Sequence, residues 1–423
     1  MYADDLVLLS RSKEGLQNAL NSLNKFTNDW FLNINMSKTK YMVFSKGGKY
    51  EPQGMLYIGN EILMQCESYC YLGVIFIKSG SFKVAEKALN DKARGAMYSI
   101  LRNIYKHQAV NVDIMIDIFD KMIMPIALYN CEVWGTNMLP QKPSSNNFFD
   151  RKFLIKNTPE ITQSKYLKSV LRVPSRTSSW AVNTEIGRYP IITKVLKLMV
   201  KYLCHLKDSK SPIVNADFEI SSQLDNQGKK SWVGFVKRIL KFLDLESILY
   251  TSDQKVISLK LSKLDLNIKK NYVSVWKREM DELTDTKLDI LKLVKTCFRR
   301  EQYISQVRIP NYRSALTKMR ISAHKFPIEI DRYNNISRCE RFCPLGCQVI
   351  GDEFHYLLHC AHPSILELRS RILNEFSNMN AHFENLNDID KVIMILNPPN
   401  SEAAHLAGKL CYKLQCLFKN ITY

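Results

Sequence analysis

Apolar residues recur at helical spacing along most of the chain, and this pattern limits most strongly what the chain can fold into. Leu, Ile, Val and Phe lie three and four positions apart with polar residues between them, as on amphipathic helices that bury one face. The helices predicted in this way span residues 13–28, 166–172, 191–206, 232–245, 365–376 and 402–417. The predicted fold class is therefore mainly α, with a small α+β part at the N-terminus.

Three short apolar runs near the N-terminus predict the strands of that α+β part. Residues 6–9 are expected to form a buried strand, because the run is bounded by polar residues on both sides. The segment of residues 30–44 is expected to end in a strand, and residues 71–76 predict another, with Gly73 inside it.

An acidic pair, Asp4-Asp5, lies directly before the first of these runs. Two adjacent carboxylates in a turn can bind Mg2+, which uses one or two protein carboxylates together with waters and substrate phosphates. The alternative is an ordinary solvated turn.

The charge of the chain favours a polyanionic partner. Lys and Arg number 60 against 41 Asp and Glu, which gives a formal net charge of +19, and such a field attracts nucleic acid. Hydrophobic residues make up 46% and charged residues 24% of the chain, as in folded globular proteins. The most apolar region, residues 112–134, is interrupted by charged residues such as Asp113, Asp117, Asp120 and Lys121, so no membrane span is expected.

Basic pairs at 229–230, 237–238, 269–270 and 299–300 lie near aromatic residues in the sequence. The aromatic residues are Trp232, Phe235, Tyr272, Trp276 and Phe298. This combination predicts phosphate contacts together with stacking on bases. The alternative is that each pair is part of an ordinary solvated helix face.

Four of the eleven cysteines lie close together near His355. Cys343, Cys347, His355 and Cys360 form the pattern C-x3-C-x7-H-x4-C, which offers the sulfur and nitrogen donors that tetrahedral Zn2+ prefers. Three competing donors lie in the same region: Cys339, His359 and His362. The alternative to a zinc site is a set of buried free thiols.

Several motifs occur in an order that is familiar from one protein family. They are Tyr2-Ala3-Asp4-Asp5, residues 35–44 with Lys38-Thr39-Lys40, Tyr71-Leu72-Gly73 with Gly80-Ser81-Phe82, residues 128–135, residues 185–190, and the cysteine-rich segment after Arg338. Over nearly its whole length the chain resembles the reverse transcriptase of non-LTR (LINE-like) retrotransposons. The resemblance begins at the Tyr-Ala-Asp-Asp motif.

The resemblance implies DNA synthesis on an RNA template by phosphoryl transfer with paired Mg2+ ions. Asp4 would be the principal magnesium ligand and Asp5 would support the site. Tyr2 would contact the primer terminus, and Lys40 would face the incoming triphosphate unless it is an ordinary surface lysine. The implied partners are an RNA template and a DNA primer or target DNA, with no membrane. The implied location is intracellular, in the nucleus or the cytoplasm.

The resemblance and the composition together divide the chain into five parts. Residues 1–82 would be a partial polymerase palm with primer-grip-like strands, and residues 83–136 thumb-like helices. A linker at 137–156, rich in Asn, Pro and Ser, would lead to a basic helical region at 157–335. Residues 336–423 would hold the zinc-knuckle-like CCHC segment and the C-terminal helices. Within the helical region, the polar residues 208–231 predict a flexible joint.

In the family, a further palm Asp bridges the two metal ions. The strand that carries it would precede Met1, as would the fingers and the rest of the palm of the parent polyprotein. We therefore expect a fragment or remnant of an RNA-directed DNA polymerase that does not polymerise alone. The alternative is a non-catalytic module that binds nucleic acid with its basic helices and zinc knuckle.

Overall fold

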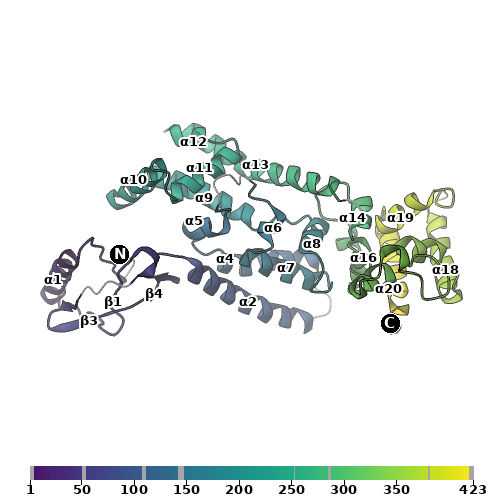
Figure 1. Ribbon diagram of the computed structural model, residues 1–423, viewed down its shortest axis with the longest axis horizontal. Helices are drawn as coiled ribbons and strands as arrows, with labels where there is room; N and C mark the ends of the chain where they lie inside the picture. The colour runs from purple at the N-terminus through teal and green to yellow at the C-terminus, as the bar shows by residue number, and fades with distance from the viewer. Residues whose placement is uncertain are drawn as a thin grey trace. The chain divides into compact units, whose positions relative to one another are not determined.

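The computed structural model describes residues 4–49, 54–106, 111–141, 147–251, 253–283, 287–379 and 382–418. The chain forms two compact units, Met1–Leu89 and Asn90–Tyr423. The described residues are mostly helical, with small sheets only in the first unit, as the apolar spacing predicts (Figure 1). Among these residues, no helix is both long enough and apolar enough to cross a membrane.

The first unit packs one helix against short strands. Its elements are α1 (Lys13–Asp29), β1 (Lys40–Tyr41), η1 (Lys46–Gly48), β2 (Leu56–Ile58), β3 (Glu61–Gln65), β4 (Ser68–Tyr71) and β5 (Val74–Ile77). In the three-stranded sheet, β3 lies between β1, to which it is parallel, and β2, to which it is antiparallel. Leu20 of α1 meets Tyr41, Leu56 and Leu63 of the sheet in the core.

The single strand predicted for residues 71–76 is wrong, because the chain reverses direction there. β4 and β5 pair as an antiparallel hairpin in which Tyr71 faces Val74. The two residues between them, Leu72 and Gly73, have φ angles of 45° and 82°. Positive φ at both central positions is the mark of a tight type I′ turn. Leu72 and Gly73 therefore form the turn between the two strands.

The buried strand predicted for residues 6–9 is also wrong. None of these residues pairs with a strand among the residues described, and Leu9 is 77% exposed. Only Leu8 packs partly against the core of the first unit. An apolar run becomes a strand when a neighbour supplies hydrogen-bond partners, and the described strands supply none here.

The second unit is built from helices. Their bounds are α2 (Lys83–Lys106, which begins in the first unit), α3 (Val112–Ile118), η2 (Phe119–Ile123), α4 (Met124–Ala127), α5 (Cys131–Trp134), η3 (Gly135–Met138), α6 (Arg151–Leu154), α7 (Thr158–Val170), α8 (Ser179–Ile186), α9 (Ile192–Asp208), α10 (Pro212–Asn226), α11 (Trp232–Phe242), α12 (Ser247–Tyr250), α13 (Gln254–Asp281), α14 (Asp289–Val294), α15 (Tyr303–Gln306), α16 (Pro310–Arg320), α17 (Pro327–Ile330), η4 (Asp331–Asn334), η5 (Arg338–Glu340), η6 (His355–His359), α18 (Pro363–Met379), α19 (Asp388–Leu396) and α20 (Ser401–Leu417). Near the C-terminus, α20 packs against α16, α18 and α19 (Figure 1).

The flexible joint predicted at residues 208–231 is a helix, α10. Pro212 occupies its first turn, where the missing N–H group costs no hydrogen bond. Gly228 follows its end with φ 70°, and the N–H group of Lys229 donates to the carbonyl of Leu224. The proline and the glycine therefore mark the two ends of a helix. Packing of α10 against α9 and α11 stabilises it.

The segment predicted as a linker, residues 137–156, buries several side chains in its described part. Met138 and Leu139 are fully buried, and so are Phe148 and Phe149. Both phenylalanine rings pack edge-on against Phe242. These stretches belong to the core of the second unit, and the division of the chain into five functional parts stays a prediction.

Candidate metal centre

A tight loop holds Cys343 and Cys347. An isolated antiparallel bridge joins Phe342 to Ile350, and the N–H group of Cys343 donates to the carbonyl of Val349 at 2.7 Å. Gly346 lies inside the loop with φ 89°, a conformation that glycine adopts without strain. The bridge therefore closes the base of the loop that carries both cysteines.

A π-helical turn, η6, positions His355 and Cys360. The N–H group of Cys360 donates to the carbonyl of His355 at 2.7 Å, five residues earlier in the chain. The Asp352 carboxylate accepts a hydrogen bond from the N–H group of His355 and so fixes the start of this turn. A π-helical turn is wider than an α-helical turn, so residues five positions apart lie on the same face of it. Such turns occur frequently at functional sites.

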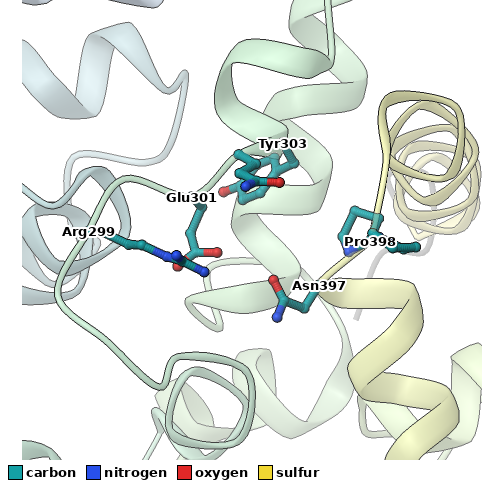
Figure 2. A pocket seen from close by; sticks show the side chains of 7 residues that line it. Arg299, Glu301, Tyr303, Asn397 and Pro398 are labelled. Carbon is teal, nitrogen blue, oxygen red and sulfur yellow. The ribbon is translucent and has the colours of Figure 1, made fainter.

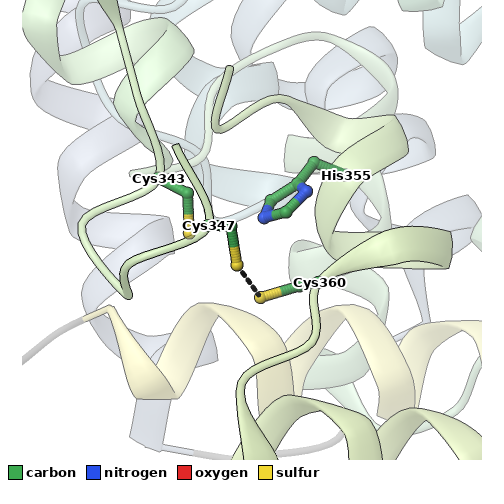
Figure 3. A group of neighbouring side chains, drawn as sticks. All are labelled: Cys343, Cys347, His355 and Cys360. Carbon is green, nitrogen blue, oxygen red and sulfur yellow. Dashed lines mark hydrogen bonds between the residues drawn. The ribbon is translucent and has the colours of Figure 1, made fainter. Parts of the chain in front are cut away.

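The four side chains with the predicted zinc-ligand spacing converge. One donor atom from each of Cys343, Cys347, His355 and Cys360 lies within 4.8 Å of all the others (Figure 3). The sulfur atoms of Cys347 and Cys360 are 3.8 Å apart. Two thiolates bound to one tetrahedral Zn2+ at about 2.3 Å are separated by about 3.8 Å. The cluster is therefore a possible Cys3His metal site and is compatible with Zn2+.

The chemistry of the donors also fits a metal. Burial lowers the pKa of His355, and His359 and Arg369 act in the same direction, so the ring is held in the neutral form that metals bind. Its Nε2 atom is buried and has no hydrogen-bond partner among the described residues. A buried nitrogen without a hydrogen-bond partner is unfavourable unless a bound ion or water interacts with it. These residues would hold Zn2+ through three sulfur atoms and one nitrogen.

The thiols of the cluster differ in their acidity. Burial raises the pKa of Cys360 to about 12. Burial acts in the same way on Cys347, but the N–H group of Ala361 and the neighbouring thiols outweigh it, and the pKa of Cys347 is lowered. Metal binding requires thiolates, so Cys347 is the easier of the two thiols to deprotonate.

The competing donors lie outside the converging group. The Cys339 side chain is exposed, and its sulfur atom lies 3.1 Å from the hydroxyl of Ser337. His359 pairs with Asp388 at 2.9 Å. His362 is buried at Nδ1 without a partner among the described residues, but it is not one of the converging donors. Sequence spacing alone left these alternatives open, since the choice depends on the direction of each side chain.

The acidic pair near the N-terminus is exposed. Asp4 and Asp5 form no hydrogen bond or ion pair with any residue that the structure describes. Lys40 is exposed on β1, where its backbone lies opposite Met64 of β3. Tyr2 lies outside the described residues.

Three of the five aromatic residues predicted to stack on bases are buried in the core instead, whereas Trp232 and Phe298 are half-buried. Tyr272 and Trp276 are 4% and 3% exposed, and both pack edge-on against Phe298. Phe235 is also buried, with Arg238 over its ring. The prediction of base stacking is therefore wrong for Phe235, Tyr272 and Trp276.

Some of the neighbouring cations are neutralised by carboxylates, while others remain available to an anionic partner. The paired cations are Lys237 with Asp225, Lys269 with Asp265 and Arg300 with Asp113. Lys229, Lys230, Lys270 and Arg299 are exposed and form no ion pair with the described residues.

A buried charge network surrounds Glu185 at the end of α8. Arg320 of α16 is fully buried and pairs with both Glu185 and Glu301. Lys295 pairs with Glu301 at 2.5 Å, and the hydroxyl of Tyr303 donates to Glu185 at 2.7 Å. The sequence contains no periodic or spacing signal for such a network, because its members come from distant segments.

A small cavity of about 160 Å3 adjoins this network (Figure 2). Arg299, Glu301, Tyr303, Asn397 and Pro398 line it. Both oxygen atoms of Glu301 are already engaged by Lys295 and Arg320. The carboxylate at this cavity is therefore neutralised by two cations, and only Arg299 of its charged lining residues forms no ion pair with the described residues.

Comparison with known proteins bears on the N-terminal residues. The family model of the reverse transcriptase (RNA-dependent DNA polymerase) matches residues 1–76. No curated protein matches the chain. The matched range contains the acidic pair and Lys40, and the Cys3His cluster lies outside it. A relation to reverse transcriptases is thus supported for the N-terminal part of the chain.

Proposed function

We propose that this chain is part of an RNA-directed DNA polymerase of a non-LTR retrotransposon, and that by itself it binds nucleic acid without polymerising. The family match over residues 1–76 is the observation that carries the proposal. The order of the later motifs, from residues 128–135 to the cysteine-rich segment, supports the non-LTR type. An RNA template and a DNA primer or target DNA would be its partners, in the nucleus or the cytoplasm.

Within this proposal, Asp4 and Asp5 are magnesium ligands of the polymerase. Tyr2 contacts the primer terminus, and Lys40 faces the triphosphate. The exposure of the acidic pair and of Lys40 supports these roles, since each side chain is accessible to substrate. Two-metal phosphoryl transfer needs carboxylates that bind both ions.

One observation supports the absence of activity in the isolated chain. Among the described residues, the only group of three or more His, Cys, Asp or Glu side chains placed to bind a metal is the Cys3His cluster. No third carboxylate therefore joins Asp4 and Asp5 in that part of the structure. A single exposed acidic pair holds two Mg2+ ions weakly.

Primer extension tests this proposal. We expect no incorporation when the purified chain is given an RNA template, an annealed DNA primer, Mg2+ and all four deoxynucleotides. The comparison proteins are Asp4→Asn and, as a matched exposed carboxylate outside the motif, Asp29→Asn. Incorporation by the wild type and by Asp29→Asn that is lost in Asp4→Asn would show an active polymerase and refute the proposed inactivity.

We also propose that the Cys3His cluster is a zinc knuckle of the nucleic-acid-binding part. Metal analysis of the purified chain should find about one zinc ion per chain, since the four donors complete one tetrahedral site. Cys360→Ser should lose the metal, and Cys339→Ser should keep it, because the Cys339 side chain lies outside the cluster. A metal-free wild type would refute the zinc site and leave buried free thiols.

A second candidate function is that of a non-catalytic nucleic-acid-binding module that uses its basic helices and zinc knuckle. The net charge of +19 and the Cys3His cluster, which do not depend on the N-terminal match, favour it. Primer extension does not separate the two candidates if the chain is inactive. They differ in the effect of Asp4→Asn on Mg2+-dependent binding of a primer–template duplex, which only the polymerase-derived chain should show.

A further inference from the structure

Arg369 is a buried cation without a partner among the residues described. Arg369 lies on α18 and is only 6% exposed. Its Nη1 atom is buried and unpaired, and no described carboxylate forms an ion pair with it. Two other arginines are buried among the described residues: Arg320 is held by two carboxylates, and Arg313 donates to the carbonyl of Val307. A buried guanidinium without a counter-charge is unfavourable, so Arg369 needs an explanation.

Arg369 lies on a helix that packs against the turn carrying part of the Cys3His cluster. The helix α18 packs against η6, the turn that carries His355 and leads to Cys360. The electrostatic influence of Arg369 reaches both residues: burial lowers the pKa of Arg369 while Cys360 acts to raise it, and Arg369 helps to lower the pKa of His355. Cys360 is fully buried, so little water screens it from the arginine.

The charge of the cluster depends on its metal. Three protonated thiols and a neutral imidazole carry no charge, and they give a buried arginine nothing to pair with. Three thiolates and an imidazole around one Zn2+ carry a net charge of −1. The metal-loaded cluster therefore has the charge that would neutralise Arg369.

We propose that Arg369 is the counter-cation of the metal centre and donates a hydrogen bond to the Cys360 thiolate when the metal is bound. This inference rests on the proposed zinc site and names a residue outside the four ligands. Such outer partners orient ligands and stabilise their charged form. Arg369 should therefore strengthen zinc binding while making the metal-free protein less stable.

The test uses the full chain and two readouts. The first is zinc affinity, measured by competition with a chromogenic chelator, and the second is the melting temperature with and without zinc. Arg369→Met keeps the length of the side chain and removes its charge, whereas Arg369→Lys keeps the charge. Arg371→Met, on an exposed position of the same helix, is the matched control.

We expect Arg369→Met to weaken zinc binding by about 10- to 100-fold. Its metal-free form should melt at the same temperature as the wild type or higher, because a buried unpaired charge is gone. Arg369→Lys should recover most of the affinity, and Arg371→Met should behave as the wild type in both readouts.

Three results would overturn the inference. Zinc affinity unchanged in Arg369→Met would show that the arginine does not serve the centre. Equal losses of melting temperature in the metal-free and zinc-bound forms would show a purely structural role. A wild type that binds no zinc would overturn the proposed metal centre itself, and this inference with it.

Discussion

At Gly187 two segments of the second unit that are distant in the sequence approach each other closely. It ends α8 with φ 66°, in the left-handed region that favours glycine. A Cβ atom there would lie 2.5 Å from the backbone of both Arg299 and Arg300. The position therefore excludes larger residues for two reasons, backbone conformation and lack of space.

We expect Gly187→Ala to lower the free energy of unfolding by more than about 2 kcal/mol, since left-handed strain alone costs ~1–2 kcal/mol and the backbone must also shift. Urea denaturation of the purified protein measures the loss. Gly228→Ala is the control, because Gly228 has φ 70° but open space around its Cβ position. Equal losses in the two variants would mean that the close approach at Gly187 contributes nothing.

At the scale of elements, a buried carboxylate caps a helix. Glu160 of α7 accepts a hydrogen bond at 2.8 Å from the N–H group of Ile192, at the start of α9. Burial raises the pKa of Glu160 to about 7, although the hydrogen bonds from Ile191 and Ile192 and the charge of Arg188 act to lower it. The folded protein therefore binds a proton at Glu160 more tightly than the unfolded chain does.

This difference makes stability depend on pH. The free energy of unfolding should fall as the pH rises from the ordinary carboxyl pKa of 4.5 to about 7, because the folded state must give up a proton that it holds more tightly. The contribution of Glu160 is roughly 3 kcal/mol at about 1.4 kcal/mol per pKa unit. Urea denaturation at several pH values should show that Glu160→Gln lacks this dependence. Parallel pH profiles for the two proteins would contradict the prediction.

The elements differ in how far the sequence determines them. Residues 13–28 and 191–206 were predicted as helices and form α1 and α9, since their apolar stripes match a helix that buries one face. The hairpin turn at Leu72 and Gly73 was missed because apolar residues continue on both sides of it, as in a single strand. The reversal depends on the positive φ angles of these two residues, which the apolar pattern does not reveal. Gly59 and Asn60, between β2 and β3, were the signal for another missed hairpin.

The candidate metal centre was more predictable than the charge network of the same unit. The spacing of Cys343, Cys347, His355 and Cys360 is local, so the sequence already indicated these four side chains, and the structure excluded the competing donors. The pairing of Glu185 with Arg320 joins residues 135 positions apart. Neither spacing nor composition carries information about a partner at that distance. The same holds for Arg369, whose burial depends on the packing of α18.

At the scale of the whole molecule, the excess of cations governs the interaction with nucleic acid. Some basic residues are used internally, as Lys237 is by Asp225, and others remain exposed, as Lys230 and Lys270 are. Phosphate contacts release counterions, so affinity falls as salt rises. Because Tyr272 and Trp276 are buried, stacking of bases on these rings does not add to the electrostatic attraction.

We expect affinity for RNA or DNA to fall at least ~10-fold between about 50 and about 200 mM salt, as measured by fluorescence anisotropy. Replacing Lys230 and Lys270 by Gln should reduce the slope of affinity against salt. Lys237→Gln is the matched control and should leave the slope nearly unchanged, since Asp225 already pairs with Lys237. Affinity that stays flat across this range would refute phosphate contact.

The packing of α20 limits which segment of the chain can carry the metal centre when it is moved into another protein. Gln415 of α20 donates to the carbonyl of Ala315 in α16, and Arg320 of α16 donates to the carbonyl of Leu396 in α19. A graft that carried only the cysteine-rich loop and the helices after it would leave α16 behind and expose the face of α20 that α16 covers. Recombination that moves this centre intact between proteins must therefore exchange a segment that begins before Pro310.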